Sequence, residues 1–135
     1  MITEQEILNK YPEIFRNKDK SPQETCMCWG LSVPEDWLPI IDELCHALQN
    51  CGFGMMCPET KNHISKRPQV VAEQVKSKFN QLRFYYSLDF DVEVGKDTRE
   101  KYMKYYDGMI AFAENRIRQI ENEQDEHISS LSDWK

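Results

Sequence analysis

The sequence predicts an α+β fold in which two N-terminal helices and a long C-terminal helix pack on a β-hairpin or small antiparallel sheet. Three observations support this prediction. Residues 69–88 are rich in β-branched and aromatic side chains and are interrupted once, at Asn80-Gln81. Two amphipathic segments precede this run, and one long amphipathic segment follows it. A chain of 135 residues with 40% apolar composition fits a single domain over 1–135.

The first helix is predicted to begin after Thr3, because Thr3 and Glu6 have the spacing of a capping box. Apolar residues then recur at helical spacing as far as Phe15. Pro12 removes one amide donor and crowds the preceding turn, so we expect the helix to kink or to start afresh near Tyr11.

The second helix is predicted to begin at Asp36, after a turn over residues 32–35. Pro39 then falls in its first turn, where a missing amide donor is tolerated. Gly52 is expected to end the helix in a left-handed conformation. Residues 53–68 contain two prolines and no apolar period, which predicts a loop with Phe53, Met55 and Met56 against the core.

The central run is predicted to form strands over 69–78 and 82–89. Its apolar residues also fit helical spacing, so the β-branched and aromatic enrichment and the polar break decide in favour of a hairpin. Asn80-Gln81 is a weaker turn signal than Asn-Gly, because Gln resists a positive φ.

The last helix is predicted to begin with Asp97 as its cap and Glu100 completing the box. Gly108 lowers its helix propensity by about 1 kcal/mol relative to Ala, which suggests close approach of another backbone or a tolerated defect. After Ile120 the apolar pattern stops, and residues 121–135 are expected to fray. The predicted apolar stripe consists of Tyr102, Tyr105, Tyr106, Met109, Phe112, Ala113, Ile117 and Ile120.

The net charge of −6 is concentrated in the C-terminal third, since residues 87–135 carry 12 acidic and 7 basic side chains. An acidic surface repels phosphate backbones, so direct nucleic-acid binding is disfavoured and a protein partner is favoured. No apolar run is long enough to span a bilayer, and the N-terminus lacks the pattern of a signal peptide. We therefore expect no membrane contact and a location in the cytoplasm of the cell that makes the protein.

Cysteines raise two chemical hypotheses. Five cysteines and three histidines could supply zinc ligands, but no C-x-x-C or H-x-x-x-H pair is present, so buried or loop thiols are the favoured interpretation. Cys28 could act as a nucleophile if His46 or His63 approached it in space. Asp89, Asp91 and Glu93 could offer oxygen ligands, but a calcium-loop pattern is missing and solvated charges are favoured. We expect no catalytic residue, metal or cofactor.

Two surfaces are predicted to bind a partner. On the second strand, Arg83 and Tyr85 share one side, and with Lys76 and Lys78 they form a basic and aromatic patch suited to protein or RNA. The second surface is the acidic outer face of the last helix, with Glu114 and Glu121 as its site residues, followed by Glu123, Asp125 and Glu126. The sequence also leaves a homodimer open.

Two segments carry a resemblance to a known family. They are Cys26-Met27-Cys28-Trp29-Gly30 with Trp37-x-x-Ile40-Ile41-Asp42, and Gln74-Val75-Lys76-Ser77-Lys78-Phe79 with Leu82-Arg83-Phe84-Tyr85-Tyr86-Ser87. Over roughly residues 7–90 the chain resembles a family of small, uncharacterised phage and prophage proteins. It departs from that family at Asn80-Gln81, where relatives tend to have Gly followed by Gly or Thr, and it lacks the C-x-x-C-G segment with which many relatives end.

The resemblance implies an accessory phage protein without implying an activity. By analogy with other small acidic phage proteins, the function that we expect is binding and inhibition of a bacterial defence complex, as an anti-CRISPR protein does. The partner would be a host protein or ribonucleoprotein complex in the host cytoplasm. The alternative is a zinc- or nucleic-acid-binding regulatory protein of phage origin, and a weaker one is a cysteine-dependent enzyme built around Cys28.

Overall fold

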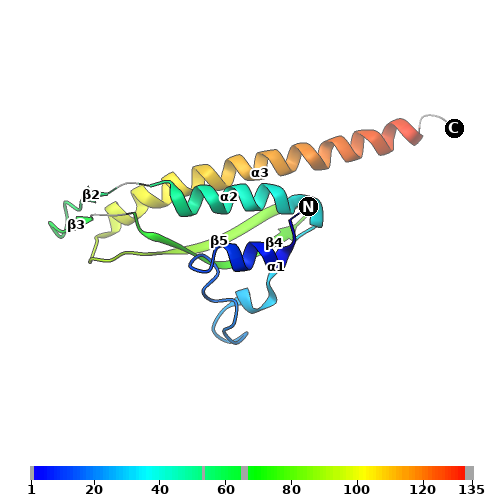
Figure 1. Ribbon diagram of the computed structural model, residues 1–135. Helices are drawn as coiled ribbons and strands as arrows, with labels where there is room; N and C mark the ends of the chain where they lie inside the picture. Colours follow the sequence, from blue (N-terminus) through cyan, green and yellow to red (C-terminus); the bar gives the residue numbers. More distant parts are fainter. Residues whose placement is uncertain (1, 53, 65–66, 133–135) are drawn as a thin grey trace.

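The computed structural model describes the backbone of residues 2–52, 54–64 and 67–132, and the side chains of that part as far as Glu123. The fold is α+β, with the predicted helices and hairpin in the predicted order. Figure 1 shows α2 and α3 side by side above the long β4–β5 hairpin, with α1 below α2. The elements are α1 (Glu4–Lys10), η1 (Cys26–Trp29), β1 (Leu31–Ser32), η2 (Glu35–Trp37), α2 (Leu38–Asn50), β2 (Met55–Met56), β3 (His63–Ile64), β4 (Gln69–Lys78), β5 (Gln81–Asp89) and α3 (Lys96–Ser132).

The main sheet has three strands in the order β1-β4-β5. β4 and β5 are antiparallel, and the register runs from Gln69 opposite Asp89 to Lys78 opposite Gln81 with a bulge between Ala72 and Gln74. The short β1 pairs in parallel with Val75 and Lys76, so the sheet is mixed rather than purely antiparallel. Parallel pairing here is possible because a long connection, which includes α2, separates β1 from β4.

The turn of the β4–β5 hairpin is formed by Phe79 and Asn80, one residue earlier than predicted. Both have positive φ, 54° and 60°, as a two-residue turn of the primed type requires. Gln81 therefore begins β5 and is spared the left-handed conformation. Asn tolerates that conformation well, whereas an aromatic residue adopts it at a cost.

The N-terminal helices follow the capping signals, with shorter bounds than predicted. Thr3 caps α1 by accepting a hydrogen bond from the Glu6 amide at 3.2 Å. α1 ends before Pro12, and the buried Ile14 and Phe15 lie in the turns that follow it, because proline stops the regular helix. α2 begins at Leu38, two residues after the predicted start, because residues 35–37 form the 3-10 turn η2.

The predicted loop over 53–68 contains the small antiparallel hairpin β2–β3. Met55 is half-buried against the core, as predicted, whereas Met56 is exposed. Phe53 lies outside the described residues. Two-residue strands carry too little periodic pattern to be detected in a sequence.

α3 begins at Lys96, one residue before the predicted cap, and Asp97 lies in its first turn. One of its N-terminal amides is instead satisfied from the β2–β3 loop, since Glu59 Oε1 accepts hydrogen bonds from the Thr98 amide at 3.2 Å and from Thr98 Oγ1 at 3.1 Å. The helix continues to Ser132, where fraying had been expected after Ile120. No Gly or Pro interrupts residues 121–132, so the backbone can stay helical without an apolar stripe.

One core lies between the sheet and the helices. Trp37, Tyr102 and Tyr106 are its largest fully buried side chains. α1 is tied to α2 through Asp42, whose carboxylate accepts from Lys10 Nζ at 3.0 Å and from Tyr11 Oη at 2.9 Å. Within the described part of the chain, the helices are too short or too polar to cross a bilayer.

Candidate binding surfaces

The register of β4 and β5 brings the predicted basic and aromatic residues onto one face. Lys76 lies opposite Arg83, and Gln74 lies opposite Tyr85, so alternate residues of the two strands point to the same side. Val75 and Phe84 point to the other side and are buried in the core. We call this surface the hairpin face, and it consists of Gln74, Lys76, Lys78, Gln81, Arg83 and Tyr85.

The hairpin face offers three cations and one accessible ring. The Tyr85 side chain is 47% exposed, and Lys76 Nζ lies 5.9 Å from the centroid of its ring. A cation over an aromatic ring at this distance is attracted by the ring's quadrupole, which helps to hold Lys76 and Tyr85 together at the surface. The face therefore combines positive charge with an accessible aromatic ring.

Phe79 extends this surface at the tip of the hairpin, and sequence reasoning missed it as a binding residue. Its side chain is 83% exposed, and Lys78 Nζ lies 5.8 Å from its ring centroid. Phe79 has a positive φ, which is rare for an aromatic residue and costs free energy. The sequence signal that could have found it is its position between two strands, where a large apolar residue has no core to enter.

The predicted acidic residues Glu114 and Glu121 do not lie on the outer face of α3. Both are half-buried on the flank of the helix that faces the rest of the molecule. Glu121 Oε1 accepts a hydrogen bond from the indole of the buried Trp37 at 2.8 Å. Helical spacing places residues 114 and 121 beside the core positions 110 and 117, which explains the error.

Glu114 connects the two predicted surfaces. Burial raises the pKa of its carboxyl group, and the nearby cations of Arg83 and Arg118 partly offset that rise. Glu123 is exposed, as predicted, whereas the side chains of Asp125 and Glu126 lie outside the described part.

A groove between α2 and α3 is strongly apolar. It has a volume of about 510 Å³, and apolar side chains of both helices line it, with the Glu43–Arg116 ion pair at its rim. Two members of the predicted buried stripe, Tyr105 and Phe112, stand at its edge with 40% and 66% of their side chains exposed. We call this surface the α2–α3 groove, and apolar residues that line it include Ile40, Leu44, Ala47, Tyr105, Met109 and Phe112.

Gly108 lies on the α3 side of the groove. Apart from its chain neighbours and the nearby backbone of α3 itself, no heavy atom of the described residues lies within 4 Å of the position that a Cβ would occupy there, so the close approach of another backbone that the sequence suggested is not made within the described part of the chain. The consequence is an open space on the surface of α3, one helical turn before Phe112.

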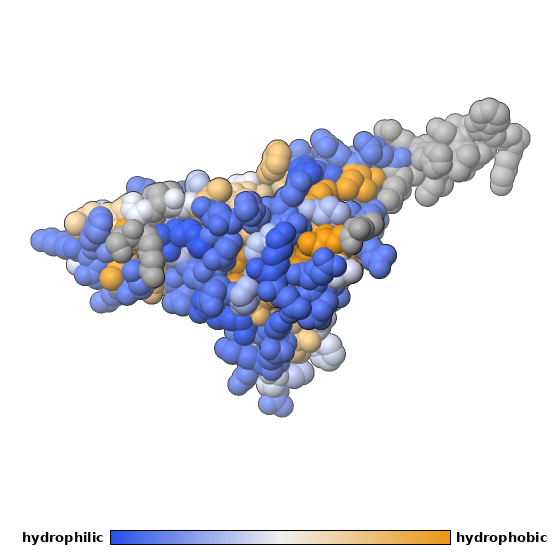
Figure 2. Space-filling view, in the orientation of Figure 1, coloured by the Kyte–Doolittle hydropathy of each residue, from blue (hydrophilic) through white to orange (hydrophobic). Residues whose placement is uncertain are grey.

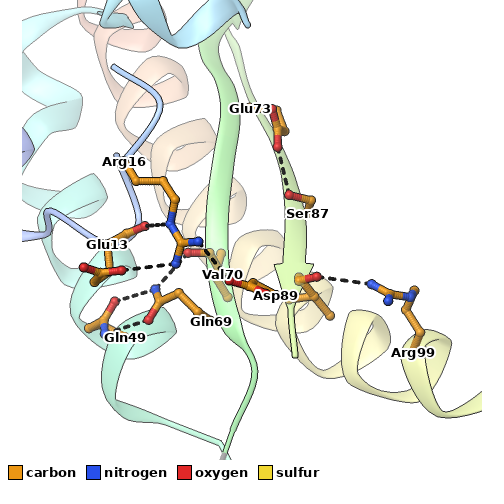
Figure 3. Close-up of polar contacts among 10 residues, drawn as sticks. Glu13, Arg16, Gln49, Gln69, Val70, Glu73, Ser87, Asp89 and Arg99 are labelled. Carbon is orange, nitrogen blue, oxygen red and sulfur yellow. Dashed lines mark hydrogen bonds and ion pairs between the residues drawn. The ribbon is translucent and has the colours of Figure 1, made fainter. Parts of the chain in front are cut away.

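A second hollow, of about 440 Å³, is lined in part by residues that make polar contacts with one another. Figure 3 shows these contacts. Arg16 Nη1 contacts the Asp89 carboxylate at 2.9 Å and Arg16 Nη2 contacts Glu13 at 3.1 Å. Gln49 and Gln69 pair through their side-chain amides. These contacts tie the N-terminal segment to the end of β5, so Asp89 has a partner within the chain.

The cysteines are reduced and dispersed. Cys45 is buried in the core, as predicted, and burial raises the pKa of its thiol. Cys28 Sγ donates to the Thr25 carbonyl, and the His46 ring contacts Asn50. The thiol and this imidazole therefore each have a partner other than the one that the nucleophile hypothesis requires. In residues 2–52, 54–64 and 67–123, no group of three or more His, Cys, Asp or Glu side chains could hold a metal ion.

Cys57 is fully buried beside the start of α3. Its Sγ lies 3.2 Å from Glu59 Oε2, and the Gly95 amide donates to the same sulfur at 3.5 Å. Glu59 in turn caps α3. This cluster fixes the β2–β3 loop against the helix N-terminus.

No family model, curated protein or solved structure matches this chain. The resemblance to phage proteins therefore stays a prediction. The functional argument rests on the surfaces described above.

Proposed function

We propose that this protein is a non-enzymatic binding protein that docks on a partner protein through the hairpin face. The observation that supports the proposal is the β4–β5 register, which gathers Lys76, Lys78, Arg83 and Tyr85 on one face beside the exposed Phe79. Aromatic and arginine side chains contribute most of the affinity in many protein interfaces.

Charge indicates the kind of partner surface. Three cations stand on the hairpin face of a chain whose net charge is −6, so this face is locally opposite in sign to the whole molecule. An acidic site on the partner would complement it and would orient the protein as it approaches. The strained, exposed Phe79 would supply the apolar contact at the centre of such an interface.

The partner that we propose is a bacterial defence complex in the host cytoplasm, which the protein would inhibit as an anti-CRISPR protein does. Support comes from the resemblance of residues 26–30, 37–42, 74–79 and 82–87 to small phage and prophage proteins, and from analogy with other small phage inhibitors. Glu114 belongs to the proposed interface because it lies beside Arg83, and Glu121 follows it on the same flank of α3.

One observation favours a second candidate function, binding of single-stranded nucleic acid. Lys and Arg side chains interleaved with exposed rings, as Lys76, Arg83, Tyr85 and Phe79 are, can hold phosphates while the rings stack on bases. The overall negative charge opposes this function, since phosphate binding depends on a net release of counterions.

A phage challenge tests the proposal. Bacteria with an active CRISPR or restriction system express the protein and are infected with a phage that the system restricts. We expect expression to raise the efficiency of plating by more than about tenfold, an effect that even a modest block of binding can produce. The double variant Lys76→Glu/Arg83→Glu should abolish that gain.

The matched control is Lys20→Glu/Lys61→Glu, which makes the same change in charge at exposed lysines outside the hairpin face. Equal loss in both double variants, or no gain against a panel of CRISPR and restriction systems, would overturn the proposal. A gel shift of labelled single-stranded DNA or RNA in about 150 mM salt, lost in Lys76→Glu/Arg83→Glu, would favour the second candidate instead.

A further inference from the structure

The solvent side of α3 carries an uncharged stripe across the middle of the helix. Its members recur at steps of three or four residues, with Ala111 and Phe112 side by side at one step, so they lie on one face, and each is exposed. Charged residues make up 30% of the whole chain, so five exposed uncharged positions along one face are unusual for it. The exposed Asp107 within this span lies on another side, where it accepts from Tyr86. The stripe consists of Tyr105, Gly108, Ala111, Phe112 and Asn115.

The stripe adjoins the α2–α3 groove, so a projecting side chain of the stripe stands beside the hollow of the groove. Phe112 projects with 66% of its side chain exposed. Gly108, one turn earlier, leaves open space, and the groove beside it holds about 510 Å³. Figure 2 shows apolar atoms at the surface along the upper side of the molecule, where α2 and α3 lie.

We propose that two copies of this chain form a dimer through this surface, with the two α3 helices antiparallel and Phe112 of each copy seated over Gly108 of the other. A two-fold axis makes both contacts at once, because the projection and the hollow belong to the same face. Glycine allows the close approach of the helices that this seating needs.

The charge distribution along α3 selects the antiparallel arrangement. Residues 96–104 contain four basic and two acidic side chains, whereas residues 119–132 contain four acidic ones and no Lys or Arg. This order is unfavourable for the helix's own dipole, which prefers acidic residues at the N-terminal end and basic residues at the C-terminal end. In an antiparallel second copy the exposed Lys101 and Lys104 of one chain approach the exposed Glu123 of the other, whereas a parallel copy would place the lysines of the two chains side by side.

The size of the surface sets the expected affinity. The face from Lys101 to Gln119 is about 28 Å long at 1.5 Å per residue. With a width of about 20–25 Å over α3 and the rim of α2, each copy would bury about 600–700 Å², which is at the low end for a specific interface. We therefore expect a reversible dimer with a dissociation constant in the micromolar range.

Sedimentation velocity of the purified full chain, over a protein concentration range of about 5–500 µM, tests the proposal at the affinity that this area implies. The unmodified chain should shift from monomer to dimer across that range. Phe112→Asp should weaken the association by more than about tenfold, because it places a charge in the apolar contact. Its matched control is Phe79→Asp, the same change at an exposed aromatic residue of the hairpin tip, which should leave the association unchanged.

Gly108→Gln separates loss of the interface from loss of the fold. Glutamine favours a helix far more than glycine does, so the thermal midpoint of the variant should rise. Its side chain would occupy the space that Phe112 of the second copy needs, so association should fall by more than about tenfold. A more stable fold together with weaker association cannot come from unfolding.

A chain that stays monomeric over the whole range would overturn the proposal, as would equal effects of Phe112→Asp and Phe79→Asp. If the chain is monomeric but Phe112→Asp abolishes the plating gain, the groove binds a host partner and the dimer proposal is likewise overturned. The dimer does not depend on the proposed function, since purified protein alone reports it and the hairpin variants are expected to remain dimeric.

Discussion

The hairpin face and the α2–α3 groove are built in different ways. The hairpin face comes from two adjacent strands joined by a two-residue turn, and it carries three cations. The α2–α3 groove comes from helices far apart in the sequence, and its floor is apolar. A surface on neighbouring strands follows directly from local alternation, whereas a surface between helices depends on how the whole core positions them.

The largest expected difference in the free energy of unfolding is between substitutions of two tryptophans, one buried and one exposed. Trp37 is fully buried beneath the helices that form the groove, and its indole donates to Glu121. Trp37→Ala should lower the free energy of unfolding by about 3–5 kcal/mol, measured by urea denaturation followed by circular dichroism. The control Trp29→Ala, at a side chain that is 69% exposed, should change it by no more than about 0.5 kcal/mol. Similar losses in both variants would contradict the assigned burial.

High pH should weaken the packing of α3 beneath the groove. Burial raises the pKa of Tyr106 to about 12, with the Arg67 cation acting in the opposite direction, and burial also raises the pKa of Tyr102. The neutral form is favoured in the fold, so the stabilising contribution is complete below about pH 10, the ordinary pKa of tyrosine, and is lost as pH rises towards 12.

For Tyr106 this loss amounts to about 2–3 kcal/mol between pH 10 and pH 12. Urea denaturation at a series of pH values from 9 to about 12 should show it. Tyr106→Phe should make the decline shallower, because the variant has one buried phenol fewer to ionise. An unchanged slope in the variant would count against this contribution.

The neighbouring Tyr85 and Tyr86 allow the two sides of β5 to be compared by their effect on the free energy of unfolding. Tyr86 Oη donates towards Asp107 at 2.6 Å and lies 3.0 Å from the Met103 carbonyl, so it fastens the strand to α3. Tyr86→Phe should cost about 1–2 kcal/mol of unfolding free energy, because these acceptors lose a half-buried donor. Tyr85→Phe, on the hairpin face, should cost no more than about 0.5 kcal/mol in the same denaturation experiment. A larger cost at Tyr85 would reverse the assignment of the faces.

Two carboxylates should give the smallest effects, with opposite signs. The raised pKa of Glu114 shows that the fold disfavours its charged form, so Glu114→Gln should stabilise the protein at pH 7 by up to about 0.5 kcal/mol after allowance for solvent screening. Glu43→Gln at the rim of the groove removes an exposed ion pair with Arg116 and should destabilise by up to about 0.5 kcal/mol. Thermal melts of both variants, measured side by side, would resolve the sign.

The raised pKa of Glu114 should also affect how the free energy of unfolding depends on pH. Its stabilising contribution is complete in acid, below the ordinary glutamate pKa, and is lost as pH rises through the raised value. Glu114→Gln should remove that part of the acid-side profile. If the two profiles are parallel, the shift makes no contribution to stability.

Much of the fold was predictable because its signals are local. The capping box of Thr3 and Glu6, the proline in the first turn of α2 and the β-branched run of β4 each act within a few residues. The hairpin face was predictable for the same reason, since alternation on a strand needs no knowledge of distant segments. The turn was misplaced by one residue because Phe79, an improbable residue for positive φ, occupies it.

The exposure of Phe112 and the burial of Glu121 were not predictable, for a different reason. A helical stripe of apolar residues predicts that one face is buried, but its edges are decided by what packs on them. Phe112 lies at the edge where α2 stops covering α3, so it is exposed. Glu121 lies at the edge that Trp37 reaches, so it is half-buried. The periodicity of a helix does not indicate where the elements that pack against it end.

The sequence by itself determined the α+β class, the order of the helices and strands, and the side of the hairpin on which the cations stand. Each of these follows from periodicity and capping over a few residues. Only the tertiary structure decided that Glu59 caps α3, that Glu121 holds Trp37 and that Phe112 and Gly108 stand beside an open groove. These contacts join residues 39 or more positions apart in the chain or depend on the absence of a neighbour, because packing, and not local preference, sets which distant surfaces meet.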